Sequence, residues 1–122
     1  MQIKTRELSS VALDWAVAQC EDLFNKGFEC HLDSDGKVRI RPDGALFVFS
    51  PSSNWSQAGQ IIEREKYAIV PPDNEVPVFL AGRWDNGLQS PVMFGPTPLI
   101  AAMRAYVASK IGDVVDVPEE LV

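Results

Sequence analysis

Apolar residues recur at helical spacing in two segments of the chain, one near each end. Residues 10–25 carry them three or four positions apart, and Gly27 follows, which predicts a helix. The polar side of this helix is formed by Asp14, Gln19, Glu21 and Asp22. Residues 98–111 are apolar apart from Arg104 and the polar end of the segment, and Gly112 follows. This second helix is therefore expected to be largely buried, with Thr97 as its N-cap and Pro98 as its first residue.

Between the two helices, short segments alternate in polarity and are separated by turn-forming residues. This pattern predicts strands over residues 28–32, 37–41, 46–49, 67–70, 76–80 and 91–94. Residues 50–60 have the composition of an ordered loop, and residues 83–87 that of a hairpin turn. The order of elements favours an α+β fold: a mostly antiparallel sheet with two helices packed on one face.

Length and charge narrow the class of protein. A chain of 122 residues fits a single domain, 1–122, with an acidic C-terminal tail from about residue 113. The net charge of -6 argues against direct nucleic-acid binding, which depends on cationic contacts to phosphates. The N-terminus lacks the apolar core of a signal peptide, and no stretch approaches the ~20 apolar residues that span a bilayer. We therefore expect a cytoplasmic protein that does not enter membranes.

Three segments together resemble the NinX-like family of small proteins from temperate phages and prophages. They are residues 12–18 (ALDWAVA), residues 50–65 (from SPS in 50–52 through Trp55 to IIERE), and residues 95–104 (GPTPLIAAMR). The resemblance implies a phage-encoded accessory protein of unknown biochemical role that works in the bacterial host cytoplasm. It carries over no catalytic residue, and residues 73–89 look expanded relative to the family.

The start of the second helix and the serine-rich segment before it are the candidate binding site. A helix N-terminus attracts anions through its free N–H groups, and Gly95 and Thr97 flank this one. Small polar side chains and an indole are typical of a pocket for a planar or phosphorylated ligand, although each also serves as a cap, a turn or a core plug. These residues are Ser50, Ser52, Ser53, Asn54 and Trp55. We expect the two segments to border one concavity.

Three further side chains are candidates for this site. Trp15 could stack on a ligand ring in place of Trp55, and Arg64 or Arg104 could neutralise a ligand charge. Arg104 has two open interpretations, because a guanidinium on an apolar helix needs a partner. It forms an internal ion pair, with Glu63 or Asp14, or it faces the ligand.

No recognised catalytic motif is present, so we leave enzymatic activity uncertain and expect no cofactor and no metal. The leading hypothesis is non-catalytic binding of a small anionic or nucleotide-like ligand, with sequestration of a host signal as its conjectured purpose. The alternative is an acidic interaction module that docks onto a host or phage protein through residues 73–89 and the acidic tail. The sequence leaves the oligomeric state open.

Overall fold

The computed structural model describes residues 1–21, 29–32, 38–41, 47–83 and 91–121. The elements along these residues are β1 (Gln2–Lys4), a 3-10 turn (Thr5–Glu7), α1 (Ser10–Cys20), β2 (Glu29–Leu32), β3 (Val38–Arg41), β4 (Phe47–Val48), α2 (Trp55–Glu65), β5 (Tyr67–Val70), β6 (Phe79–Arg83), β7 (Met93–Gly95), α3 (Pro98–Lys110), β8 (Val114–Asp116) and a second 3-10 turn (Glu119–Leu121).

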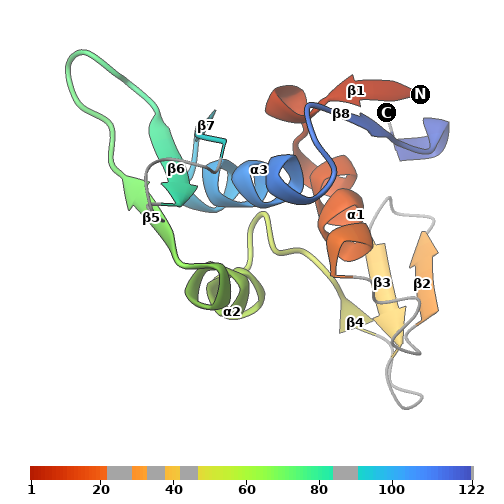
Figure 1. Cartoon of the computed structure of the whole chain (residues 1–122). Helices are drawn as coiled ribbons and strands as arrows, with labels where there is room; N and C mark the ends of the chain where they lie inside the picture. Colours follow the sequence, from red (N-terminus) through yellow and green to blue (C-terminus); the bar gives the residue numbers. More distant parts are fainter. Residues whose placement is uncertain (22–28, 33–37, 42–46, 84–90, 122) are drawn as a thin grey trace.

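The strands form three small antiparallel groups around the helices, which confirms the α+β class (Figure 1). β1 pairs with β8, β2 with β3 and β3 with β4, and β5 with β6 and β6 with β7. The sequence led us to expect one sheet and two helices. The described residues instead place three helices between separate sheets, because each short strand pairs mainly with its neighbours in the chain.

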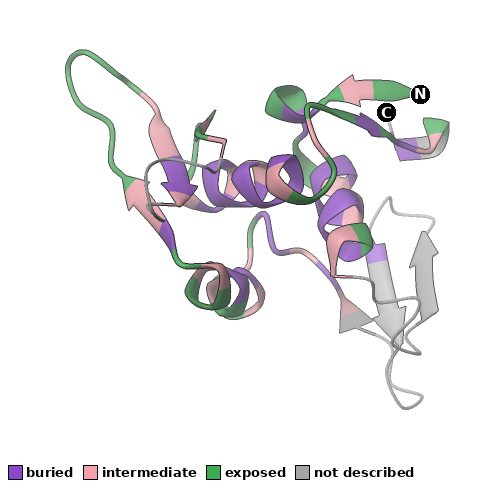
Figure 2. Ribbon diagram, in the orientation of Figure 1, coloured by how far each residue is buried: buried purple, intermediate pink, exposed green. Residues whose placement is uncertain are grey.

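α3 is the central element of the fold, and most of its side chains are buried (Figure 2). It contacts α1, α2 and the β5–β6–β7 sheet. The predicted start is confirmed: Thr97 Oγ1 accepts the Ile100 N–H at 3.1 Å, and Pro98 is the first helical residue. The helix ends at Lys110, and Ile111, expected to pack on the sheet, is 44% exposed because it lies beyond the last turn.

The expected loop over residues 50–60 is wrong in its second half, where α2 begins at Trp55. Asn54 is the N-cap, and its Oδ1 accepts the N–H groups of Ser56 at 2.9 Å and Gln57 at 3.3 Å. The helix ends at Glu65, and the following C-cap residue, Lys66, has a φ of 60°, which puts it in the left-handed region. Turn-forming residue types therefore act here as a helix cap, and the buried positions Ala58 and Ile61, three residues apart, belong to the apolar side of the helix that the loop interpretation overlooked.

β6 begins three residues later than the sequence indicated. Asp73 Oδ1 accepts the N–H groups of Glu75 and Val76, and the Asp73 N–H donates to Val76 O, so residues 73–76 form a closed turn rather than a strand. Residues 22–28, which include the expected end of the first helix, lie outside the described residues. So does most of the expected hairpin turn over residues 83–87, because residues 84–90 are not described.

The segment expected as an acidic tail folds back onto the N-terminus. The β8 strand pairs with β1, the amino group of Met1 donates to Val117 O at 2.8 Å, and Val115 and Val117 are buried. The acidic side chains of this segment alternate with these valines, so its apolar positions fix it to the fold.

Truncation of Met103 tests the buried position of α3. The Met103 side chain is fully buried (0% exposed), so Met103→Ala is expected to lower the free energy of unfolding by about 2 to 5 kcal/mol through lost burial and a residual cavity. Ile111→Ala, at an exposed position on the same segment, serves as the control in thermal and urea unfolding. Equal stability of the two variants would contradict the packing described here.

Candidate functional site

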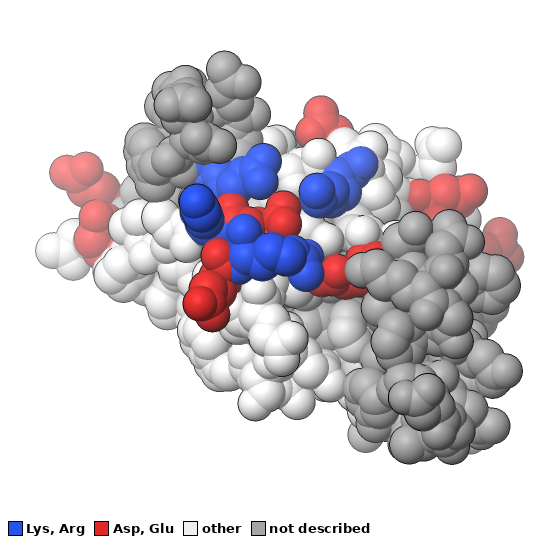
Figure 3. Space-filling model, turned by 60° about the horizontal axis from the view of Figure 1, so that its bottom comes forward, with Lys and Arg blue, Asp and Glu red and all other residues white. Residues whose placement is uncertain are grey.

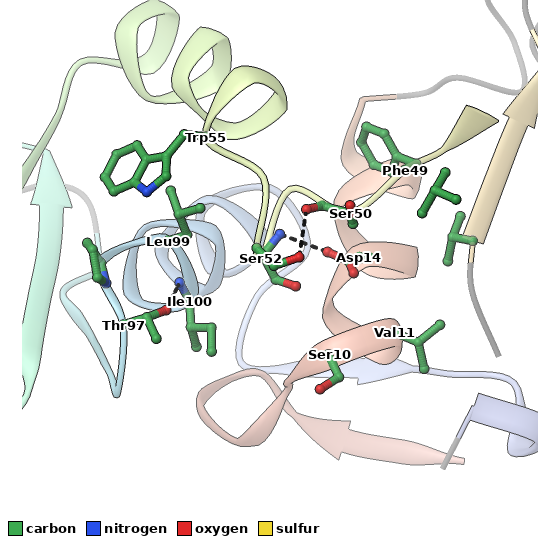
Figure 4. A pocket seen from close by; sticks show the side chains of 14 residues that line it. Ser10, Val11, Asp14, Phe49, Ser50, Ser52, Trp55, Thr97, Leu99 and Ile100 are labelled. Carbon is green, nitrogen blue, oxygen red and sulfur yellow. Dashed lines mark hydrogen bonds between the residues drawn. The ribbon is translucent and has the colours of Figure 1, made fainter. Parts of the chain in front are cut away.

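A pocket of about 770 Å³ lies where α1, the segment before α2, and the start of α3 meet (Figure 4). Trp55 and Thr97 lie on the α3 side of the pocket and Asp14 on the α1 side, with Ser52 between them. The volume is within the range of small-molecule sites. Its described lining consists of Ser10, Val11, Asp14, Val38, Val48, Phe49, Ser50, Ser52, Ser53, Trp55, Thr97, Pro98, Leu99 and Ile100.

The serine-rich wall of the pocket, residues 50–53, is held in place by hydrogen bonds to Gln57 of α2 and by backbone hydrogen bonds within residues 50–54. Gln57 accepts the Ser50 N–H through Oε1 at 2.7 Å and donates from Nε2 to Val48 O at 2.9 Å. Ser50 O accepts the N–H groups of Ser53 and Asn54, which closes a turn directly before the helix. The wall is therefore built from backbone geometry, and Trp55 follows it as the first residue of α2.

Asp14 joins this wall to α1. Its Oδ1 accepts the Ser52 N–H at 2.8 Å, and the residue is only 7% exposed. Burial raises the pKa of Asp14 to about 6, and hydrogen bonding from Ser52 offsets only part of that effect. The sequence placed Asp14 on the polar side of the first helix, which is wrong. The one signal in the sequence for the burial of Asp14 was its position among apolar residues of the helix. Its partner, the Ser52 N–H, comes from a distant segment and could not be read from the sequence.

The α3 side of the pocket offers an indole and few free donors. Trp55 is 58% exposed, so part of its side chain is open to a ligand. In the first turn of α3, Pro98 has no N–H and the Ile100 N–H is taken by Thr97 Oγ1. Thr97 O accepts the Ala101 N–H, which leaves the Leu99 N–H without an acceptor among the described residues. The helix start is thus a weaker anion site than its sequence suggested.

The structure brings some of the candidate residues to this pocket and leaves others away from it. Ser50, Ser52, Ser53, Trp55 and Thr97 line it, although they come from two segments of the chain. The remaining five, Asn54, Trp15, Gly95, Arg64 and Arg104, are not among its described lining residues. Asn54 caps α2, and Trp15 packs partly buried against the core.

Gly95 and Arg104 fix the contact between β7 and α3. A Cβ at Gly95 would lie 2.7 Å from the Ala101 backbone nitrogen, so only glycine permits this approach. Arg104 donates from Nε to Leu8 O at 2.8 Å and from Nη1 to Phe94 O at 2.9 Å. The expected ion pair with Glu63 or Asp14 is therefore replaced by two carbonyl partners, which join the segment before α1 to β7.

Arg64 belongs to a charged cluster at the seam of α2, β6 and α3 (Figure 3). Its guanidinium lies 2.9 Å from Glu21 and 3.1 Å from Glu65. Glu65 also contacts Arg83 at 3.4 Å and Lys110 at 3.6 Å. Burial opposes ionisation of Glu65, but these cations hold its pKa below the ordinary value. We refer to Arg64, Glu65, Arg83, Lys110 and Glu21 as the Glu65 cluster.

Fold and pocket together define a small α+β protein with a pocket of mixed polar and apolar lining at the start of its central helix. Residues 4–110 match the model of the family described as bacteriophage P22 NinX. The chain therefore belongs to this NinX-like phage protein family, as its three sequence motifs indicated. No curated protein sequence matches the chain significantly.

The described residues contain neither a candidate membrane span nor a candidate metal site. Within that part of the chain, no helix is long and apolar enough to cross a membrane. Nor do three or more His, Cys, Asp or Glu side chains gather there as a candidate metal site.

Substitution of Arg104 tests its structural role. Arg104→Ala leaves Leu8 O and Phe94 O without their donor, so we expect a loss of about 1 to 3 kcal/mol in the free energy of unfolding. Lys4→Ala, which removes an exposed cation, is the control in urea unfolding. Unchanged stability of Arg104→Ala would contradict the role assigned to the two carbonyl contacts.

The raised pKa of Asp14 predicts a specific pH dependence of stability. The folded state holds this proton up to about pH 6, whereas the unfolded state releases it near 3.8, so the contribution of Asp14 is present at low pH and falls as pH rises between these values. The loss amounts to about 3 kcal/mol. Asp14→Asn keeps an acceptor for Ser52 and removes the titration.

The measurement is the free energy of unfolding of both proteins from pH 4 to pH 7. Other carboxyl groups titrate equally in both, so the difference isolates Asp14. We expect the variant to gain stability relative to the wild type as pH rises through 6. A difference that stays constant over this range would show that Asp14 has an ordinary pKa.

Proposed function

We propose that this phage protein binds, without catalysis, a small nucleotide-like ligand in the pocket between Ser50, Trp55 and Thr97. The observation that carries the proposal is the pocket itself: an exposed indole beside a wall of serines, in a volume of about 770 Å³. A nucleoside fits such a site because its flat base stacks on an aromatic ring while hydroxyl and backbone groups bond its polar atoms.

The arrangement of charge supports recognition of the base and sugar more than of a phosphate. Arg104 and Arg64 are engaged elsewhere, and the Leu99 N–H is the free amide of the first turn of α3 among the described residues. An anionic group on the ligand would therefore lie at the rim, near Thr97 and solvent. Sequestration of a host signalling nucleotide in the bacterial cytoplasm is the biological role that we attach to this proposal.

Binding is the simpler proposal than turnover because no recognised catalytic motif accompanies Asp14 in the sequence. The Asp14 Oδ1 accepts the Ser52 N–H, so the carboxyl group also helps to hold the pocket wall in place.

Removal of the Trp55 ring tests the proposal. Calorimetry with a panel of nucleosides, nucleotides and cyclic dinucleotides is expected to yield a binder, and Trp55→Leu is expected to weaken its affinity about tenfold or more through lost stacking. The melting temperature of the free variant should change little because Trp55 is 58% exposed. Phe94→Leu, at another exposed aromatic residue (50%) outside the described pocket lining, is the matched control.

Native mass spectrometry of protein from induced cells gives an independent result. A retained small molecule would support the proposal. A panel that produces neither heat nor a melting shift, together with a co-purifying host or phage protein, would overturn it in favour of the acidic interaction module.

A further inference from the structure

We infer that Asp14 makes this pocket selective for a nitrogen base that presents adjacent N–H donors, as guanine does, rather than for a phosphate. The inference rests on the proposed function and names the ligand class and the residue that selects it. It follows from two observations: the fold places the carboxyl group of Asp14 at the pocket, and it places the guanidinium groups of Arg64 and Arg104 elsewhere.

Asp14 is the one charged side chain among the described residues that line the pocket. Figure 4 shows its carboxyl group directed toward Ser52 at the pocket wall. An ionised carboxylate offers about four lone-pair sites on its two oxygens and donates none. The backbone N–H of Ser52 occupies one of them, at 2.8 Å, and hydrogen bonding from the Ser52 side chain also favours the ionised carboxylate. The remaining capacity fits a ligand that donates hydrogen bonds.

No described cation compensates this carboxylate at the pocket. Arg104, on the neighbouring helix α3, donates to Leu8 O and Phe94 O, and Arg64 is held in the Glu65 cluster. A phosphate placed beside Asp14 would meet a like charge at low dielectric. The carboxylate of Asp14 therefore repels a phosphate at the α1 side of the pocket. At the α3 side, the Leu99 N–H is the one free backbone donor of the first helical turn among the described residues that could bind such a group.

Folding alone does not explain a carboxylate at this position. The contact with Ser52 needs only an acceptor, which an asparagine would supply without a charge to desolvate. Burial disfavours the ionised form, so Asp14 costs stability at neutral pH. Residues that cost stability in this way are concentrated at functional sites.

Guanine matches a carboxylate better than the other common bases do. Its ring N–H and exocyclic amino group are adjacent donors that can bond both oxygens of one carboxylate. Adenine places an acceptor next to its amino group, and uracil places acceptors on both sides of its ring N–H. Hydrogen bonds to a charged partner are about twice as strong as neutral ones, so the difference between bases should be large.

The experiment compares guanosine, adenosine, uridine and inorganic phosphate by calorimetry against the wild type, Asp14→Asn and Glu75→Gln. Glu75→Gln removes the same charge at an exposed site outside the described pocket lining. We expect guanosine to bind the wild type at least tenfold more tightly than uridine, and phosphate to give no heat. Asp14→Asn should lose this preference, whereas Glu75→Gln should keep it.

The outcomes separate this inference from the proposed function. Equal affinity for guanosine and uridine, a preference that survives Asp14→Asn, or tight binding of phosphate alone would overturn the role of Asp14 while leaving a ligand pocket. Absence of binding by every nucleoside and nucleotide would overturn the proposed function as well. Melting curves of the free variants establish that each is folded, and Trp55→Leu, which leaves Asp14 intact, should weaken all bases to a similar degree.

Discussion

The burial of α3 is the constraint on which the rest of the structure depends. Its apolar side chains face α1 on one side and the β5–β6–β7 sheet on another, and α2 covers a third. A helix enclosed in this way leaves little exposed surface for its polar residues. Arg104 must therefore reach backbone carbonyls, and Lys110, at the last turn, reaches Glu65. This packing fixes the first turn of α3, and it therefore also fixes the pocket wall that this turn forms.

Elements that fill the core or carry a cap were predictable from the sequence. The apolar run with Thr97 and Pro98 gave the start of α3, and the Tyr67–Val70 strand was found at its predicted position. α2 was missed because Ser52, Ser53 and Asn54 are equally typical of loops and of helix starts. Asn54 followed by buried positions at Ala58 and Ile61 was the signal that distinguishes the two.

The candidate site was only partly predictable, for a physical reason. Two parts of the pocket have local sequence signals. Thr97, on the α3 side, is recognisable as a helix N-cap, and the serine wall is recognisable as a cluster of small polar residues. Asp14 and Ser10 come from a helix that is distant in the sequence, and only the packing of α1 against α3 brings them to the pocket. The sequence also made Arg64 and Arg104 candidates for contact with a ligand, with an internal ion pair as the alternative for Arg104. Their partners, Glu21 and the carbonyls of Leu8 and Phe94, are tertiary contacts that no local pattern encodes.

The pocket lies at a junction that the fold closes only in part. Its α3 wall belongs to the core, whereas its α1 wall is tied to the serine segment through the Asp14–Ser52 hydrogen bond. That bond carries an electrostatic cost, because hydrogen bonding from Ser52 offsets only part of the desolvation of the carboxylate. A ligand that donates to Asp14 and stacks on Trp55 would satisfy the carboxylate and join both walls. Binding and folding would then be coupled, so occupancy of the pocket would stabilise the junction that forms it.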